Sequence, residues 1–301
     1  MLAPATAERI RAAVAEIAYV PNLLAGGLAS SRSRLVAVLV PDIANSIFND
    51  TIEAMVDALA ADGYMPMLGL TRADDSRTGS LIEAAVSRRV DGIILTGGIV
   101  DDTIREQLRT SGATVIETWG LPPDPVDIAV GFSHRAVGAE LADFLAERGY
   151  ERPHVVVADG DRARARRDGF RDRWTALGGA EPTETPVPIP SRFSHGRLVF
   201  RRIADMAVRA DVVLCGSDVI GQAVIAEALA AGLKVPTDLA VVGFGNLAPS
   251  GAMRPTMTTV DIDGARIGRE AVGVLRRRAA GETIVNRHID VGFRIIARES
   301  A

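Results

Sequence analysis

Short apolar runs alternate with longer helical segments from Leu35 onward, and this alternation restricts the fold more than any other feature. The apolar runs are rich in Val, Ile and Leu and are predicted to be strands at 35–40, 65–70, 92–96, 114–117, 154–158, 212–215 and 239–243. Strands that are apolar on both faces and separated by helices form parallel sheets covered by helices. The sequence therefore predicts an α/β protein with doubly wound parallel sheets.

Helical periodicity fills the gaps between the predicted strands. Helices are predicted at 48–62, 78–88, 101–111, 135–148, 165–177, 196–207 and 219–231. Glycines stand just past several helix ends, where a left-handed C-cap is needed, at Gly63, Gly112, Gly149, Gly178 and Gly232.

The repeat has too many units for one sheet and restarts near 130–135, which indicates two lobes. We expect a first lobe of residues 35–131 with 263–286, and a second lobe of residues 132–262 with 287–301. A helix at 265–278 and final strands at 288–293 and 295–297 would cross back and complete both sheets. Residues 1–34 precede this core as a partial all-α headpiece with hinge and linker. A cleft between the lobes, at the carboxyl ends of the strands, is where a small ligand is expected.

Composition excludes several classes of protein. The 301 residues carry a formal net charge of −4, so any contact with nucleic acid must be local. Cys215 is the only cysteine, which rules out an intrachain disulfide and a multi-cysteine zinc site. No apolar run approaches the roughly 18 residues of a membrane span, and no signal-peptide core is found. We therefore expect a cytoplasmic protein with no cofactor and no metal ion.

The N-terminal residues combine several features in a fixed order. An amphipathic helix at 5–17 precedes Tyr19-Val20-Pro21-Asn22, and a short segment ending at Leu28 leads into a basic linker at 30–34. This order resembles the end of the DNA-binding headpiece in the lactose-repressor (LacI) family. Further segments resemble the same family in order and spacing, at 40–48, 89–96, 166–170, 215–219, 235–245 and 254–260. The segments at 115–119, 125–133 and 243–245 are similar to its gluconate-repressor branch.

The resemblance implies a DNA-binding transcriptional repressor with a type I periplasmic-binding-protein-like core. It implies operator DNA as a partner, a homodimer or tetramer, and association with the nucleoid. A small sugar or sugar acid, such as gluconate, would act as the effector that controls operator binding. The helix pair that reads the major groove would lie before Met1.

Hinge residues implied to contact DNA are Tyr19, Asn22, Ala25 and Leu28. Gly26 and Gly27 lie within the same hinge segment, and each costs about 1 kcal/mol of helix stability relative to alanine. We therefore expect a weakly formed hinge helix.

Effector residues are expected where strands end and helices begin. Asn45, Ser46 and Phe48 lie at such a turn, where free backbone N–H groups point to the cleft, although Phe48 also suits a helix core. Arg166 matches the family's ligand-binding arginine, and its guanidinium suits a carboxylate or vicinal hydroxyls. The alternative is that Arg166 lies on a solvent-exposed face of its helix, because several other arginines occur in the same segment. The remaining expected effector residues are Thr71, Thr96, Ser133, Phe193, Ser217, Asp218 and Asn246.

Two of these positions depart from the family pattern. Asn246 stands where the family usually has an aspartate; asparagine keeps an acceptor and removes a charge, which favours an anionic effector. Ser133-His134 replaces the commoner Asp-Asn pair, and His134 is interpreted as a helix-start residue rather than a catalytic one.

Two other classes of protein, an enzyme and a stand-alone receptor, share parts of this pattern. Residues 243–248 match a dinucleotide fingerprint, but Pro249-Ser250-Gly251 follows where the phosphate-binding helix should start. The sequence has no P-loop, nucleophile elbow or zinc-protease motif, so we do not expect an enzyme. A stand-alone sugar-binding receptor of the periplasmic type is the alternative function, and it would need no hinge like the segment at 19–28.

Overall fold

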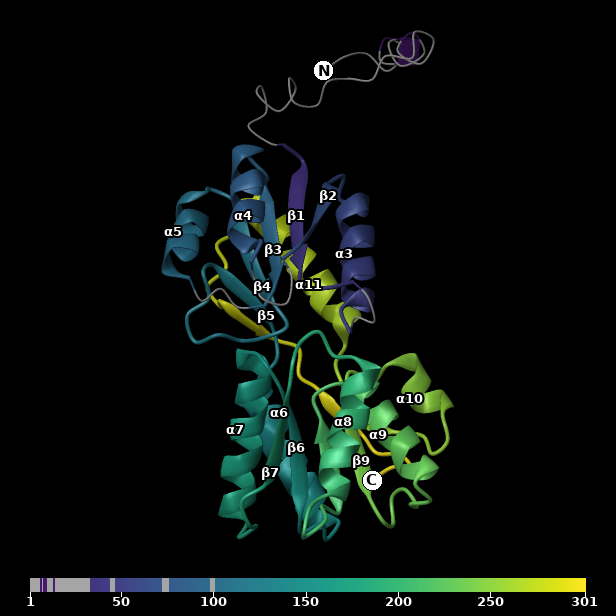
Figure 1. The fold of residues 1–301 in the computed structure, drawn as a ribbon. Coiled ribbons are helices and arrows are strands. Elements are labelled where there is room, and N and C mark those ends of the chain that lie inside the picture. The colour runs from purple at the N-terminus through teal and green to yellow at the C-terminus, as the bar shows by residue number, and fades with distance from the viewer. Residues whose placement is uncertain are drawn as a thin grey trace.

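The computed structural model describes residues 33–43, 47–71, 76–97 and 101–301, with Thr6, Glu8, Arg9 and Ala13 as isolated helical residues. The predicted hinge residues Tyr19, Asn22, Ala25 and Leu28 lie outside the described residues, as do Asn45 and Ser46. The described core has two lobes, each built on one sheet (Figure 1).

The first lobe contains a parallel six-stranded sheet in the order β11-β5-β4-β3-β1-β2. Its strands are β1 (Leu35–Val40), β2 (Met65–Leu70), β3 (Gly92–Thr96), β4 (Thr114–Thr118), β5 (Ile128–Gly131) and β11 (His288–Asp290). Successive side chains of β1 point to opposite faces of the sheet and pack into two separate hydrophobic cores. This alternation is expected of a strand that is buried on both faces. Val36, Val38 and Val40 pack with α3 (Asn49–Ala61) and α11 (Gly264–Ala279). Ala37 and Leu39 pack with α4 (Thr78–Ser87) and α5 (Asp102–Thr110).

The second lobe repeats this plan with the strand order β12-β10-β9-β8-β6-β7. Its strands are β6 (Pro153–Ala158), β7 (Thr183–Val187), β8 (Val212–Cys215), β9 (Ala240–Phe244), β10 (Thr258–Asp261) and β12 (Arg294–Ile296). The pairing of β10 with β12 is antiparallel, and the other pairings are parallel. One face is covered by α6 (His134–Glu147) and α7 (Asp161–Ala176), and the other by α8 (Phe193–Ala204) and α9 (Asp218–Ala230). The short α10 (Ala248–Ala252) follows β9.

The chain passes between the lobes after β5, after β10 and after β11. The expected boundary at residue 287 is too early, because His288 pairs with Ala129 of β5 and so belongs to the first sheet. The last passage therefore lies between Asp290 and Arg294. The first passage is tight: a Cβ on Gly131 would lie 2.4 Å from the backbone nitrogen of Gly120.

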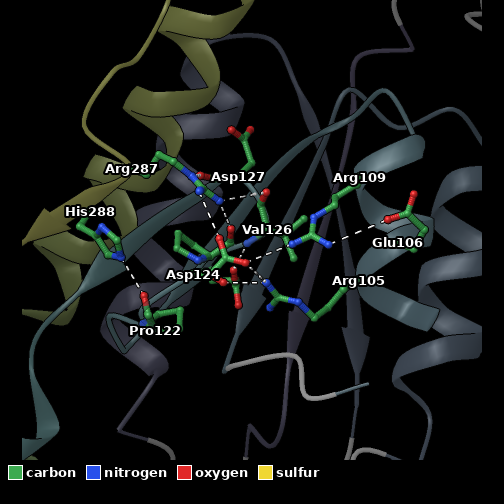
Figure 2. Close-up of polar contacts among 11 residues, drawn as sticks. Arg105, Glu106, Arg109, Pro122, Asp124, Val126, Asp127, Arg287 and His288 are labelled. Atoms are coloured by element: carbon green, nitrogen blue, oxygen red, sulfur yellow. Dashed lines mark hydrogen bonds and ion pairs between the residues drawn. The ribbon is translucent and has the colours of Figure 1, made fainter. Parts of the chain in front are cut away.

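A network of arginines fixes the loop between β4 and β5 (Figure 2). Asp124 accepts from Arg105 and Arg109 of α5 at 3.1 and 3.2 Å, and from Arg287 at 3.2 Å. His288 Nε2 lies 2.7 Å from the carbonyl oxygen of Pro122. These contacts join α5, the loop and the start of β11, so they hold the β11 edge of the first sheet.

Helix ends and sheet edges of this fold differ in how clearly the sequence marks them. The glycines expected at helix ends all have positive φ. Strands β5, β7 and β10 are absent from the predicted strands. In β7, Thr-Glu-Thr-Pro-Val has little of the apolar character of an inner strand and lies at the edge of its sheet. Among the described residues, no helix is long and apolar enough to cross a membrane.

Candidate functional site

Aromatic rings connect the two lobes near the point where the chain first passes between them. Phe48, just before α3, meets Trp119 edge to face with ring centroids 4.9 Å apart. Trp119 lies 6.0 Å from Phe132, and Phe132 lies 6.3 Å from Phe244 at the end of β9. Trp119 and Phe132 are buried, whereas Phe48 is half-buried. The predicted site residue Phe48 therefore both packs on a core ring and keeps part of its surface accessible.

Arg166 reaches out of α7 toward this aromatic group. Its Nη1 lies 2.9 Å from Nδ1 of His134, and its guanidinium carbon lies 4.1 Å from the centre of the Phe244 ring. His134 Nε2 lies 2.8 Å from the carbonyl oxygen of Trp119. Arginine only donates, so Nδ1 accepts and Nε2–H donates to Trp119. The neutral Nε2–H tautomer of His134 satisfies both contacts.

Two arginines of α7 lie at this site. The guanidinium carbon of Arg162 lies 5.6 Å from the centre of the Phe48 ring, so a residue of the second lobe contacts the first. Burial, with a smaller contribution from Arg162, lowers the pKa of Arg166 to about 9, so Arg166 stays protonated at neutral pH. Burial and the charges of Arg166 and Arg162 lower the pKa of His134 well below its usual range. An anion placed here would offset these unfavourable charge interactions.

The arginines around Arg166 have different surroundings. Arg164 pairs with Asp159 and Asp161, and Arg173 pairs with Asp143. Arg167 pairs with Asp168 and Glu184, and Arg171 lies 3.5 Å from Asp168. Within the described residues, the Arg166 guanidinium contacts a neutral imidazole and an aromatic ring, and neither of them neutralises its charge.

Asp218 supports the site from within the second lobe. It is completely buried, and its carboxylate accepts from Thr259 Oγ1 at 2.6 Å and from Ser250 Oγ and Leu247 N at 2.7 Å. Burial raises the pKa of Asp218 against the effect of these donors. Asp218 was expected to contact the effector; here its hydrogen bonds hold the segment that follows β9.

Asn246 lies in that segment with a left-handed φ of 47°, a conformation that asparagine tolerates better than most residues. Its Nδ2 donates to Asp261 at 2.9 Å, and its Oδ1 accepts from Arg298 at 2.7 Å. The amide thus bridges a carboxylate and a guanidinium, which an aspartate could not do without placing two carboxylates together.

Most of the other expected site residues have local partners. Ser133 caps α6 by accepting from Ala136 N, and Ser217 caps α9 by accepting from Val219 N. Thr96 lies 3.2 Å from Thr118 through their hydroxyls. Thr71 is buried after β2, while Phe193 is 51% exposed at the start of α8.

The sequence did not reveal the roles of Trp119, His134 and Arg162. Trp119 lies in a segment that resembles the gluconate-repressor branch, which was the available signal for it. His134 was seen as a helix-start residue, and it is one, but its ring also joins Trp119 to Arg166. No group of three or more His, Cys, Asp and Glu side chains able to hold a metal ion was found among the described residues.

Comparisons with known proteins show what the whole chain is similar to. Residues 142–301 match the periplasmic binding protein-like domain. The HTH-type transcriptional regulator GntR of Pseudomonas aeruginosa is 32% identical over 296 residues, which are 98% of this chain and 86% of that protein. A LacI-family transcriptional regulator from Silicibacter pomeroyi has a TM-score of 0.90 at 26% identity, over 100% of this chain and 91% of that one. The transcription regulator GntR from Chromobacterium violaceum has a TM-score of 0.83 at 29% identity, over 88% of this chain and 98% of that one.

Proposed function

Because the chain belongs to the lactose-repressor family of transcriptional regulators, we propose that its core binds a small sugar acid and thereby controls operator binding. The observation that carries the proposal is the Arg166 guanidinium, whose polar contact is the neutral ring of His134, a ring that itself lies against the first lobe at Trp119. A carboxylate is the natural partner for such a group, since it can accept two parallel hydrogen bonds.

Two neighbouring features support an anionic effector over a neutral one. Arg162 adds a second positive charge beside Phe48. Asn246, where the family resemblance implies an aspartate, is uncharged and so adds no second carboxylate beside Asp261. The C–H faces of the ligand would pack on the half-buried ring of Phe48 and the exposed ring of Phe193. Asn45 and Ser46, which lie outside the described residues, remain candidates from the sequence for its hydroxyls.

Effector binding would act through the relative orientation of the lobes. A ligand that holds Arg166 against the first lobe favours one orientation, and the differential affinity for that orientation determines how far the equilibrium shifts. The proposed readers of this shift are the hinge residues Tyr19, Asn22, Ala25 and Leu28. Operator binding would place the protein on the nucleoid, and the core would bind its ligand without catalysis.

A homodimer is the proposed assembly, with a tetramer as a further possibility for the same chain. Its support is the edge strand β2, where Met65 is 62% exposed and Leu68 is 52% exposed. Exposed apolar side chains on an open sheet edge favour burial against a partner. Sedimentation at increasing protein concentration tests this, and a species that stays monomeric would contradict it.

Calorimetry tests the effector class. Gluconate and related sugar acids should release or absorb heat and saturate, whereas glucose, which lacks the carboxylate, should bind more weakly. Binding of a neutral nucleoside or disaccharide with no response to any sugar acid would contradict the proposal. The regulator function is supported by family membership over the stand-alone receptor, which would lack control of DNA.

A further inference from the structure

We propose that His134 is a positioning residue that aims Arg166 at the effector and ties it to the backbone of the opposite lobe. This inference rests on the proposed function, because it deepens the role of the same site. It starts from the place of His134 in the chain. The residue opens α6 directly after the first passage between the lobes, so its backbone belongs to the second lobe while its ring lies against the first.

Both ring nitrogens are used, and they serve different lobes. Nδ1 accepts from Arg166 of α7 at 2.9 Å, and Nε2–H donates to the carbonyl of Trp119 at 2.8 Å. A single proton on the ring satisfies both bonds in one tautomer only. The imidazole therefore connects the guanidinium to a fixed backbone atom instead of merely filling space.

The far end of this connection is rigid. Trp119 has a left-handed φ of 66°, is 2% exposed, and donates its indole N–H to Thr51 Oγ1 of α3 at 3.0 Å. A carbonyl held in this way cannot follow the histidine if the lobes rotate. The chain of contacts runs from Arg166 through His134 and Trp119 to a helix of the first lobe.

The ring itself is confined by its neighbours. His134 is 8% exposed, and its ring lies 4.5 Å from Phe132 and 6.3 Å from Phe244. The charged groups that act on it are Arg166 and Arg162, both from α7. These cations disfavour a proton on Nδ1, so the connection persists through the neutral range of pH.

Two substitutions separate positioning from packing. His134→Gln keeps an acceptor and a donor at the end of the side chain, whereas His134→Phe keeps the ring shape and removes both. We expect gluconate affinity to stay within about threefold of wild type in His134→Gln and to fall about tenfold or more in His134→Phe. Circular dichroism shows whether each variant folds. An affinity of His134→Phe equal to wild type would overturn the inference.

A double-mutant cycle with Arg166→Ala distinguishes an effect of His134 through Arg166 from a general effect of His134 on the fold. If His134 acts through Arg166, His134→Phe should cause no further loss of affinity once Arg166 is gone. An equal loss in both backgrounds would show that the histidine supports the fold alone, and would contradict the inference.

NMR spectra of the ligand-free protein test the His134–Arg166 contact even if no sugar acid binds. Absence of binding to wild type would contradict the proposed function, not the role of His134. Long-range proton–nitrogen NMR should then show His134 protonated on Nε2 at neutral pH, with an Nδ1 resonance that moves in Arg166→Ala. The ring is assigned by its loss in His134→Gln. A proton on Nδ1, or an Nδ1 resonance that ignores Arg166, would overturn the inference without any ligand.

Discussion

Asn246 donates its side-chain amide to the carboxylate of Asp261, with Nδ2 and Oδ1 2.9 Å apart. This bond joins the segment after β9 to the end of β10, beside the passage into α11. It explains why an uncharged side chain is suited to position 246, since the neighbouring acid already supplies the negative charge.

Asn246→Asp should therefore destabilise the protein. The substitution places two carboxylates in contact, and we expect the free energy of unfolding to fall by about 1–2 kcal/mol at neutral pH. Urea denaturation measures this, with Asn286→Asp as a control, because Asn286 Oδ1 only accepts from His288 N and a carboxylate can do the same. Sugar-acid affinity should fall as well; equal stability and equal affinity would contradict the role given to this pair.

The backbone of Gly131 lies close to the backbone of Gly120 at the first passage between the lobes, and a substitution at Gly131 tests this contact. In Gly131→Ala the new Cβ would lie 2.4 Å from the nitrogen and 2.7 Å from the oxygen of Gly120, both of which are backbone atoms. We expect a loss of about 3 kcal/mol or more in urea denaturation, because backbone must move.

Gly273 of α11 provides the matched control. A Cβ there meets nothing within 4 Å, so Gly273→Ala should raise the free energy of unfolding by about 0.5–1 kcal/mol through helix propensity. Similar effects of the two substitutions would show that the Gly131–Gly120 contact is not as tight as described.

His154 should make stability depend on pH. Its ring is fully buried between the hydroxyls of Thr183 and Thr185, and burial lowers its pKa from 6.5 to about 4. Between these values the unfolded chain binds more protons than the folded one, so stability is full above pH 6.5 and falls as the pH drops toward 4.

His154→Gln removes this titration while an amide can still bond to the two hydroxyls. The loss of unfolding free energy between pH 7 and pH 4 should be smaller in the variant by about 2–3 kcal/mol. Urea denaturation at both pH values measures the difference. Parallel losses in wild type and variant would place the proton uptake elsewhere.

The sequence predicted the repeating units well because strand and helix periodicity are local properties. The runs at 35–40 and 92–96 coincide with β1 and β3, and the two-lobed plan follows from the number of units. Edge strand β7 escaped prediction because it lacks apolar alternation, and the last boundary was misplaced because pairing with β5 depends on a residue far away in sequence.

Site residues were harder to predict, since their roles depend on contacts between distant segments. Spacing singled out Arg166, but its bond to His134 spans 32 residues and has no local signature. The hydrogen bonds that Asp218 accepts from Thr259, Ser250 and Leu247 join segments 29 to 41 residues apart, so the sequence gives no local sign of them.

Arg166 offers the most direct test of the account, through calorimetric titration of gluconate into wild type, Arg166→Ala and Arg164→Ala. Arg164 lies on the same helix but pairs with Asp159 and Asp161, so it serves as the matched control. We predict that Arg166→Ala weakens gluconate binding by about 1.5–3 kcal/mol while Arg164→Ala leaves it unchanged. Unchanged affinity in Arg166→Ala, or an equal loss in both variants, would contradict the claim that this guanidinium holds the effector.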